Sequence, residues 1–136
     1  MIAKGKGEVK TGKASYYAKK FHKRKTASGA LFDQHAFTCA HRTYPFGTKL
    51  VVRNPLNDKE VVVEVNDRGP FKKGRIIDLS LAAAKELDIV HHGVATVEVS
   101  EYFEYFEPEI DYNIPDLRIE VKLLHIEKHP LDFIND

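Results

Sequence analysis

The stretch VEVNDRGPFKKGRIIDLS, residues Val63–Ser80, decides how the chain is organised. It begins with alternating valines, which favour a strand, and the segment NDRGP at 66–70 then ends that strand abruptly. A carboxylate that follows a strand and precedes Gly-Pro projects from a rigid bend. We therefore expect Asp67 to be held in place and Arg68 to orient a ligand beside it. The alternative is structural, because Asn and Asp side chains often close a turn by bonding their own backbone.

The residues before this bend predict a β-hairpin. Thr48–Arg53 alternates in hydropathy and ends at an Asn-Pro turn signal, and Glu60–Val65 follows as a run of valines. We expect a hairpin with residues 54–59 at its tip. Because side chains alternate across a strand, every second valine of the second strand should lie on one shared face.

The residues after the bend predict one helix and further strands. Ser80–Leu87 is typical of a helix because Ser80 is a favoured N-cap residue and an alanine run follows it. Val94–Val99 and Leu117–Leu123 alternate in hydropathy as strands do. Short strands broken by turn signals, from Ala14 onward, indicate a β-rich barrel or sandwich. The sequence therefore predicts a mainly β fold with one short helix.

The composition fits a single domain and excludes several classes of protein. The chain has 136 residues, of which 43% are hydrophobic, and a domain of this size can bury a core without covalent staples. No run approaches the roughly 20 apolar residues that cross a bilayer, so we expect no membrane span. Cys39 is the only cysteine, which excludes an intrachain disulfide or a thiolate zinc cluster. His91 and His92 are adjacent rather than spaced as metal ligands, so we expect no metal and no cofactor.

The net charge of +1 hides an asymmetry along the chain. Residues 1–25 carry nine Lys and Arg against one Glu, whereas residues 101–120 carry seven Asp and Glu against one Arg. A basic segment can attract nucleic acid, acidic lipid or an anionic polymer, but an ordinary solvated terminus has the same composition. No nucleic-acid recognition motif is present, so we expect no nucleic-acid partner. We divide the chain into a flexible basic segment, 1–12, a folded domain, 13–100, and an acidic extension, 101–136.

Three further positions are candidates for chemistry. Thr26 and Ser28 belong to the loop TASG, whose hydroxyls suit a polyhydroxylated ligand, although loops of this composition are usually only turns. His41 follows an apolar run and can meet a carboxylate there, or it is a satisfied structural histidine. Asp78 precedes Ser80, so its role is either at a site or at the start of the helix.

Five motifs occur together and in order. They are GKASYY (12–17), FHKRKTASGALFD (21–33), TCAHRTYPFG (38–47), VNDRGPF (65–71) and RIIDLSLAAA (75–84). Together they resemble the rare lipoprotein A family of bacterial envelope proteins, the septal-ring lytic transglycosylase type, over roughly residues 12–100. The resemblance implies a six-stranded double-psi β-barrel with one or two short helices, related to the barrels of expansins. It also implies peptidoglycan glycan strands as the substrate.

The resemblance also implies roles for individual residues. Asp67 matches the catalytic acid of the family, His41 matches its functional histidine, and Asp78 matches a second carboxylate near the groove. We expect His41 to position Asp67 or to stabilise charge. We expect Thr26, Ser28 and Arg68 to hold sugar hydroxyls or the lactyl carboxylate. Tyr16, Tyr17 and Phe71 are expected to line the groove, and Asp78 and Tyr16 are counted with the substrate-binding residues.

Two functions from different classes follow from these matches. In a lytic transglycosylase one acid protonates the glycosidic oxygen and then takes the proton of the muramic acid 6-hydroxyl, which gives a 1,6-anhydro product without water. Such an acid needs burial or a neighbouring negative charge to work near neutral pH. The family usually has a glutamate directly after TASG, where this sequence has Ala30. That departure keeps open the alternative of a non-catalytic, expansin-like module that binds peptidoglycan or another polysaccharide.

The expected location also depends on the resemblance. No apolar signal-peptide core follows Met1, so either the protein is cytosolic or an export signal has been removed. The resemblance implies the bacterial cell envelope, either the periplasm or an outer-membrane lipoprotein.

Overall fold

The hairpin predicted before the bend forms and supplies two neighbouring strands of a closed barrel. Strand β4 (Lys49–Arg53) pairs antiparallel with β5 (Glu60–Asp67), with Val51 opposite Val62. Along β5, Val61, Val63 and Val65 are at most 6% exposed, whereas Val62 between them is 38% exposed. The alternation in the sequence therefore set the register, because a slip of one residue would expose the buried valines.

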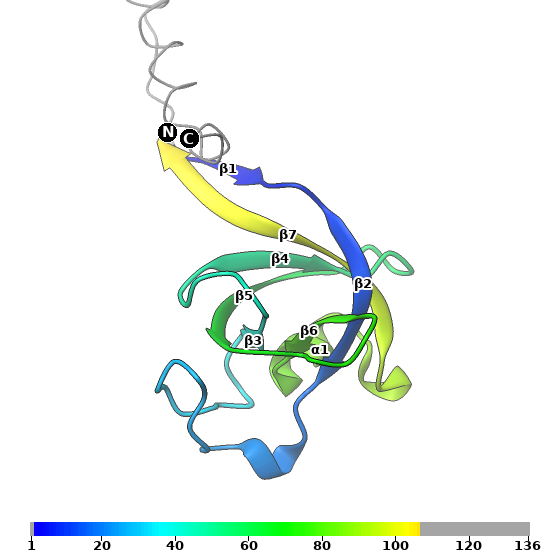
Figure 1. Ribbon diagram of the computed structural model, residues 1–136. Coiled ribbons are helices and arrows are strands. Elements are labelled where there is room, and N and C mark those ends of the chain that lie inside the picture. Colours follow the sequence, from blue (N-terminus) through cyan, green and yellow to red (C-terminus); the bar gives the residue numbers. More distant parts are fainter. Residues whose placement is uncertain (1, 107–136) are drawn as a thin grey trace, which may run out of the picture. The chain divides into compact units, whose positions relative to one another are not determined.

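Six strands close the barrel in the computed structural model, which describes residues 2–106 (Figure 1). The other four are β2 (Lys10–Tyr16), β3 (Thr38–Ala40), β6 (Arg75–Leu79) and β7 (Ala95–Phe106). The order is β7-β2-β6-β3-β5-β4, and a further pairing of β7 with β4 closes the ring. Pairs β2–β6 and β3–β5 are parallel and the rest antiparallel, so the sheet is mixed. The predicted mainly β, six-stranded barrel is confirmed.

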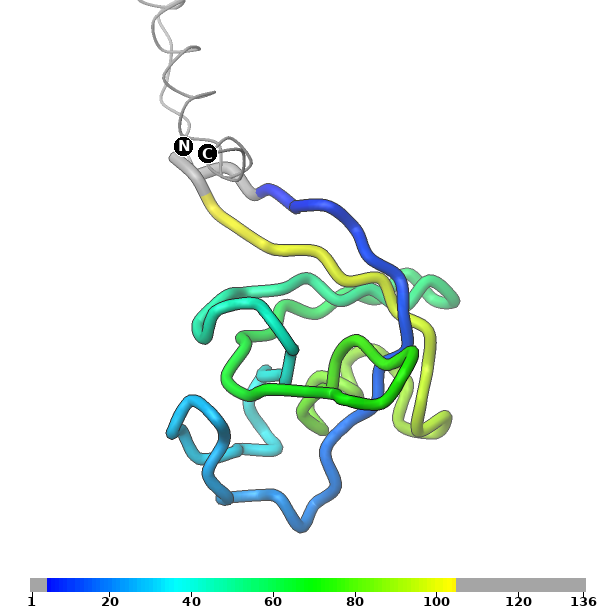
Figure 2. The backbone as a smooth tube through the Cα atoms, in the orientation of Figure 1, coloured from blue at the N-terminus to red at the C-terminus, as the bar shows by residue number. Residues whose placement is uncertain are grey.

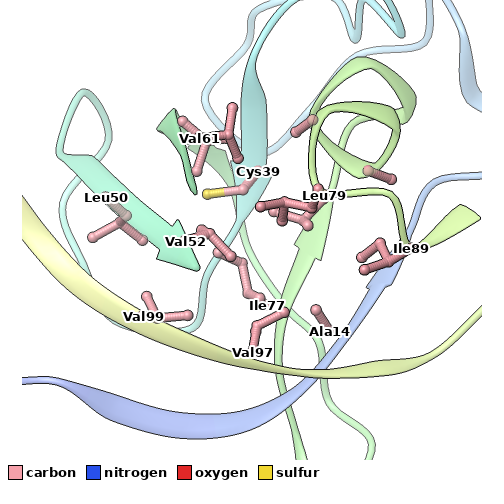
Figure 3. Close-up of a cluster of buried hydrophobic side chains, with 14 of the residues drawn as sticks. Ala14, Cys39, Leu50, Val52, Val61, Ile77, Leu79, Ile89, Val97 and Val99 are labelled. Carbon is pink, nitrogen blue, oxygen red and sulfur yellow. The ribbon is translucent and has the colours of Figure 1, made fainter. Parts of the chain in front are cut away.

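The barrel interior holds one apolar cluster (Figure 3). Cys39, 1% exposed, lies in this cluster and fills space as a small apolar residue does. Burial raises the pKa of the Cys39 thiol, with the negative charges of Asp78 and Glu64 adding to the effect. The thiol therefore stays protonated and takes no part in nucleophilic chemistry.

The predicted helix is α1 (Leu81–Glu86), and its two ends are closed by side chains. The Ser80 hydroxyl accepts a hydrogen bond from the Ala83 N–H at 3.3 Å, which confirms Ser80 as the N-cap. At the other end the carbonyl of Leu87 accepts from the amides of Asn54 and Asn57, at 3.0 and 3.1 Å. These bonds attach the tip of the β4–β5 hairpin to the helix. Two short 3-10 turns, Lys19–Phe21 and Val90–His92, complete the helical structure of the described residues.

A long connection leaves the barrel between β2 and β3 (Figure 2). It returns on itself through a single antiparallel bridge between Lys25 and Leu31. The Lys23 N–H donates to the Phe32 carbonyl at 2.7 Å, and the Phe32 N–H donates to the Arg24 carbonyl at 2.7 Å. The TASG segment lies in this connection, so its position depends on these few bonds rather than on a strand.

The chain divides into two compact units. The barrel belongs to the unit of residues 8–102, and the described part of the other unit consists of residues 2–7 and 103–106. In that second unit β1 (Ile2–Lys6) neighbours β7, and Gly5 leaves room for the ring of Phe103, which a Cβ would approach to 2.4 Å.

Strand formation extends beyond the residues that were expected to be regular. β1 falls in the segment 1–12, which was expected to be flexible, and β7 continues beyond residue 100 into the acidic stretch. The division at residues 12 and 100 stays a prediction. The expected strand Leu117–Leu123 lies outside the described residues. Among the described residues, no helix is long and apolar enough to cross a membrane.

A matched pair of valine substitutions on β5 tests the inward face of the barrel. We expect Val63→Ala to lower the free energy of unfolding by about 1–3 kcal/mol, because it leaves a cavity in a closed core. Val62→Ala removes the same atoms from the outer face and should change it by about 0.5 kcal/mol or less. Urea unfolding of both variants measures the difference. Equal losses would contradict the assigned faces of β5.

Candidate active site

Polar side chains of β5, β6 and β2 lie along one line of the sheet, on either side of the buried Ala40 of β3. Ala40 of β3 is in register with Asp67 of β5 on one side and with Asp78 of β6 on the other. Asp78 is in turn in register with Ser15 of β2. Since Ile77 and Leu79 face the core, Asp78 points outward. The two aspartates therefore flank Ala40, with backbones about 10 Å apart, which is two inter-strand spacings.

Both oxygens of the Asp67 carboxylate are held by hydrogen-bond donors. Oδ1 accepts from the backbone N–H groups of Ala27, at 2.8 Å, and Arg68, at 2.9 Å. Oδ2 accepts from the hydroxyl of Tyr17. The donors come from the TASG loop, from the bend after β5 and from the residue after β2, so the carboxylate joins three separate segments. Asp67 is therefore held in place, as its position before Gly-Pro predicted.

Tyr17 is fixed by its ring as well as by its hydroxyl. The ring stacks on Phe32, with centroids 4.5 Å apart, and contacts Phe21 edge-on at 5.9 Å. Burial, followed by the hydrogen bond and charge of Asp67 and the charge of Asp78, raises the pKa of the Tyr17 hydroxyl. The Tyr17 hydroxyl therefore stays protonated throughout the physiological pH range and can donate its hydrogen bond to Asp67.

The TASG loop is closed by its own hydroxyls and attached to β5. The Thr26 hydroxyl donates to the Ala30 carbonyl at 2.8 Å and lies 3.0 Å from the Ser28 hydroxyl. The Ser28 N–H donates to the Asn66 carbonyl at 3.2 Å. Thr26 is 8% exposed and shapes the loop, whereas Ser28 is exposed at the end of β5. This arrangement presents the Ala27 N–H to Asp67.

Asp78, the second carboxylate of the site, forms an ion pair with Arg75. Its Oδ1 accepts from the Ser15 hydroxyl at 2.5 Å and from the guanidinium of Arg75. Arg75 also donates to the Ser15 hydroxyl. The N-cap of α1 is Ser80, so Asp78 does not have the alternative role at the start of that helix.

The His41 ring bonds the loop after β3, whereas its backbone bonds that of Asp67. The His41 N–H donates to the Asp67 carbonyl at 3.1 Å. The ring Nδ1 accepts from the N–H groups of Thr43, at 3.2 Å, and Tyr44, at 3.3 Å. Within residues 2–106, no hydrogen bond joins the ring to the Asp67 carboxylate. Burial lowers the pKa of His41, and the positive charges of Lys10, Arg68 and Arg42 lower it further.

Arg68 holds the segment that follows His41. Its Nη1 donates to the carbonyls of Tyr44, at 2.9 Å, and His41, at 3.3 Å. Its guanidinium lies 4.0 Å from the centroid of the Phe46 ring, within cation–π distance. Arg68 thus connects the bend that carries Asp67 to the loop after β3.

The two tyrosines at the end of β2 lie on opposite faces. Tyr16 packs against the core cluster and donates its hydroxyl to the Val90 carbonyl at 3.0 Å. Tyr17 bonds Asp67, and Ser15 bonds Asp78. The resemblance implies substrate contact for Tyr16 and only a groove-lining position for Tyr17. The signal that distinguishes them is the alternation in GKASYY: buried Ala14 predicts that Tyr16 faces inward and that Ser15 and Tyr17 face outward.

The structure thus brings Asp67, Asp78, Ser28 and Thr26 to one region. Arg68 connects this region to the loop after β3, and Tyr16 lies on the core side. The exposed Phe71, at 82%, lies on the bend beyond Asp67. In the described part of the chain, no three His, Cys, Asp or Glu side chains gather closely enough to hold a metal ion.

Comparison with known proteins identifies relatives that share this barrel. The family described as lytic transglycolase matches residues 9–99. The endolytic peptidoglycan transglycosylase RlpA of Pasteurella multocida is 50% identical over 93 residues, which are 68% of this chain and 32% of that protein. RlpA of Neisseria meningitidis serogroup A is 40% identical over 127 residues, 93% of this chain and 53% of that protein. The chain therefore spans between about a third and a half of the length of these relatives.

Solved structures agree with the fold. The Streptomyces papain inhibitor superposes with a TM-score of 0.56 and 26% identity, covering 71% of this chain and 96% of that one. A variant expansin of Clavibacter michiganensis in complex with cellohexaose superposes with a TM-score of 0.52 and 20% identity, covering 76% of this chain and 54% of that one. The family match spans most of the chain and confirms the resemblance of its five motifs. The chain belongs to the lytic transglycolase family.

Proposed function

We propose that this chain is an endolytic peptidoglycan lytic transglycosylase that cleaves glycan strands to 1,6-anhydromuramyl products. The observation that carries the proposal is the Asp67 carboxylate, fixed at a strand end by three donors, with a second carboxylate, Asp78, two strands away. The names of the relatives support it, since they are endolytic peptidoglycan transglycosylases. No cofactor or metal is needed for this chemistry.

The hydrogen bonds of Asp67 indicate which oxygen carries the proton. Oδ1 faces two backbone N–H groups, which can only donate. Oδ2 faces the Tyr17 hydroxyl, which can turn and accept instead. When Oδ2 is protonated, both backbone N–H groups therefore keep Oδ1 as their acceptor. Asp67 Oδ2 is the group that we expect to deliver a proton to the glycosidic oxygen and to recover one afterwards.

The reaction balances with this single acid. Asp67 Oδ2–H protonates the oxygen that links muramic acid C1 to the next sugar, and the C1–O bond breaks as that sugar leaves as an alcohol. The 6-hydroxyl oxygen then bonds to C1 while its proton passes to Asp67 Oδ2. The carboxyl group is restored and no water is consumed. Two-carboxylate hydrolysis would instead need a second free carboxylate, whereas Asp78 is paired with Arg75.

The remaining predicted site residues divide by what they contact. Ser28 is exposed, and Asp78 accepts its hydrogen bonds from Ser15 and Arg75 through Oδ1. We therefore assign the Ser28 hydroxyl and the Asp78 Oδ2 to contacts with sugar hydroxyls. Thr26 and Arg68 act by shaping the two loops that flank Asp67. Tyr16 acts through packing on the core side. Tyr17 is a positioning residue for Asp67.

The substrate sets the proposed location. Peptidoglycan lies in the bacterial cell envelope, so we place the protein there, in the periplasm or as an outer-membrane lipoprotein. Glycan strands are the proposed partner, without nucleic acid.

A second function is favoured by one departure from the family. Ala30 stands where the family usually has a glutamate, and the barrel superposes on that of an expansin. A barrel that binds glycan without cutting it would use the same surface. Sedimentation with purified glycan strands, together with mass spectrometry of the supernatant, separates the two functions: binding without soluble anhydro-sugars supports the second.

Asp67→Asn tests the acid directly. We expect release of anhydromuramyl products to fall by about 10²–10⁴-fold, because the amide cannot deliver a proton. Asp88→Asn is the matched control: Asp88 is exposed at the end of α1 with φ 59°, a conformation that Asn tolerates, and should not change the rate. Product release from purified glycan strands, measured by mass spectrometry, gives both rates. Full activity of Asp67→Asn would exclude Asp67 as the acid.

Tyr17→Phe tests the hydroxyl that orients Asp67. The phenyl ring retains the stacking on Phe32, so the fold should survive, while kcat falls by about tenfold and KM stays nearly constant. Since the pKa of Tyr17 is raised, its ionisation should not limit the pH profile of the wild type on the alkaline side. An unchanged kcat together with lower thermal stability would show that Tyr17 is merely structural.

A further inference from the structure

A pocket of about 210 Å³ lies beside the ring of His41. Three strands and the segment after β3 line it, through the residues Lys10, His41, Arg42, Thr43, Tyr44, Ile76 and Val99. Lys10 of β2 and Val99 of β7 are in register, so they reach it from adjacent strands. Gly12 leaves room for Ile76, because a Cβ on Gly12 would approach Ile76 Cγ2 to 2.6 Å. The proposed acid, Asp67, is not among the lining residues.

The backbone fixes the tautomer of His41 in this pocket. Nδ1 accepts two backbone N–H bonds, from Thr43 and Tyr44, so it carries no proton. A neutral imidazole then bears its proton on Nε2 and donates there. Burial and neighbouring cations lower the pKa of His41, which keeps the ring in this neutral form. His41 is thereby a fixed donor rather than a proton carrier.

Two cationic side chains line the pocket together with His41. The guanidinium of Arg42 is anchored by the carbonyls of Pro70 and Arg75, each at 2.6 Å, and so places a positive charge at the pocket wall. Lys10 adds an ammonium group, whose charge acts on His41. The centroid of the Tyr44 ring lies 4.5 Å from that of the His41 ring. Burial, followed by the carboxylates of Glu101 and Glu8, raises the pKa of Tyr44, and neither carboxylate is among the lining residues. The charged side chains that line the pocket, Lys10 and Arg42, are therefore both cations.

The size and lining select a small anionic group. Pockets for drug-sized ligands measure about 300–1,000 Å³, so this one suits a side group of a polymer rather than a length of glycan. Ile76 and Val99 supply apolar surface next to the donors. A carboxylate on a short apolar stem matches both parts of this lining, since charge-assisted donors favour carboxylate oxygens.

We propose that this pocket binds a carboxylate of the glycan substrate, with Lys10 and the Nε2–H of His41 as its donors. The inference rests on the proposed function for the identity of the polymer. The carboxylate has two possible sources, the lactyl group of a muramic acid without stem peptide and the free carboxylate of a stem peptide. Because the His41 N–H bonds the Asp67 carbonyl and Arg68 bonds the carbonyls of His41 and Tyr44, a group held here is held next to the chain segments that position the acid.

The test uses small probes and the full chain carrying Asp67→Asn, so that binding is measured without turnover. N-acetylmuramic acid and N-acetylglucosamine differ by the lactyl ether and its carboxylate, and muramyl dipeptide moves the free carboxylate onto a peptide. The readout is the ring nitrogen and carbon signals of His41 in NMR titrations. We expect N-acetylmuramic acid to shift the His41 signals and N-acetylglucosamine to leave them unchanged. A shift with muramyl dipeptide alone assigns the pocket to the stem peptide.

Variants separate the donors from the fold. His41→Asn keeps an acceptor for the Thr43 and Tyr44 N–H groups but removes the Nε2–H, and Lys10→Gln removes the ammonium. Each should weaken carboxylate binding by about tenfold, as expected for a charge-assisted bond. Lys13→Gln, exposed on the same strand with its side chain on the opposite face, is the matched control and should bind normally. Binding for the variants is followed through backbone amide signals of residues 41–44, and thermal melting confirms that each variant folds.

Several results would overturn the assignment. Equal shifts with both monosaccharides, no His41 shift with any probe, or equal losses in Lys10→Gln and Lys13→Gln would each exclude a carboxylate site at this pocket. Failure of the proposed function is a separate outcome, because it is measured as absence of anhydro-products from the wild type. A wild type that makes no products yet passes the probe titrations would retain the pocket and lose only the transglycosylase.

Discussion

The Asp67 carboxylate is the hydrogen-bond acceptor on which the site depends. Its two oxygens accept from the N–H of Arg68, the next residue, and from the Tyr17 hydroxyl and the Ala27 N–H, which lie 50 and 40 residues away in the sequence. Loss of this carboxylate would therefore detach the residue after β2 and the TASG loop from the end of β5 at once. The group that we assign to proton transfer is therefore also the group that assembles its own surroundings.

The barrel makes this convergence possible. The short strand β3 lies between β5 and β6, which places Ala40 between Asp67 and Asp78. Parallel pairing of β3 with β5 brings the ends of both strands to one side, so the loop after β3 begins beside the bend after β5. The His41 N–H to Asp67 carbonyl bond continues that pairing. Strand order, rather than sequence proximity, thus decides which side chains meet.

The sequence was sufficient to predict the elements with strong periodicity and the fixed position of Asp67 at the bend. Alternating valines predicted the buried face of β5, Ser80 predicted the helix start, and Gly-Pro predicted a fixed Asp67. The direction of the His41 ring was not predictable, because it depends on the backbone N–H groups of Thr43 and Tyr44 in an irregular loop. The ion pair of Asp78 with Arg75 was not predictable either, because it belongs to a hydrogen-bond network that includes Ser15 from another strand.

Asp67 and His41 differ in the partners of their side chains, and this difference separates two tasks that the resemblance had linked. A proton carrier needs a group whose protonated form keeps its hydrogen bonds, and Asp67 Oδ2 meets that need because its partner is a hydroxyl. The His41 ring would lose two backbone bonds to Nδ1 on becoming a doubly protonated donor. These bonds favour Asp67 for the proposed proton transfer and His41 for the proposed recognition of the substrate. Arg68, which follows Asp67 and bonds the carbonyls of His41 and Tyr44, connects the proposed acid to the wall of the proposed pocket.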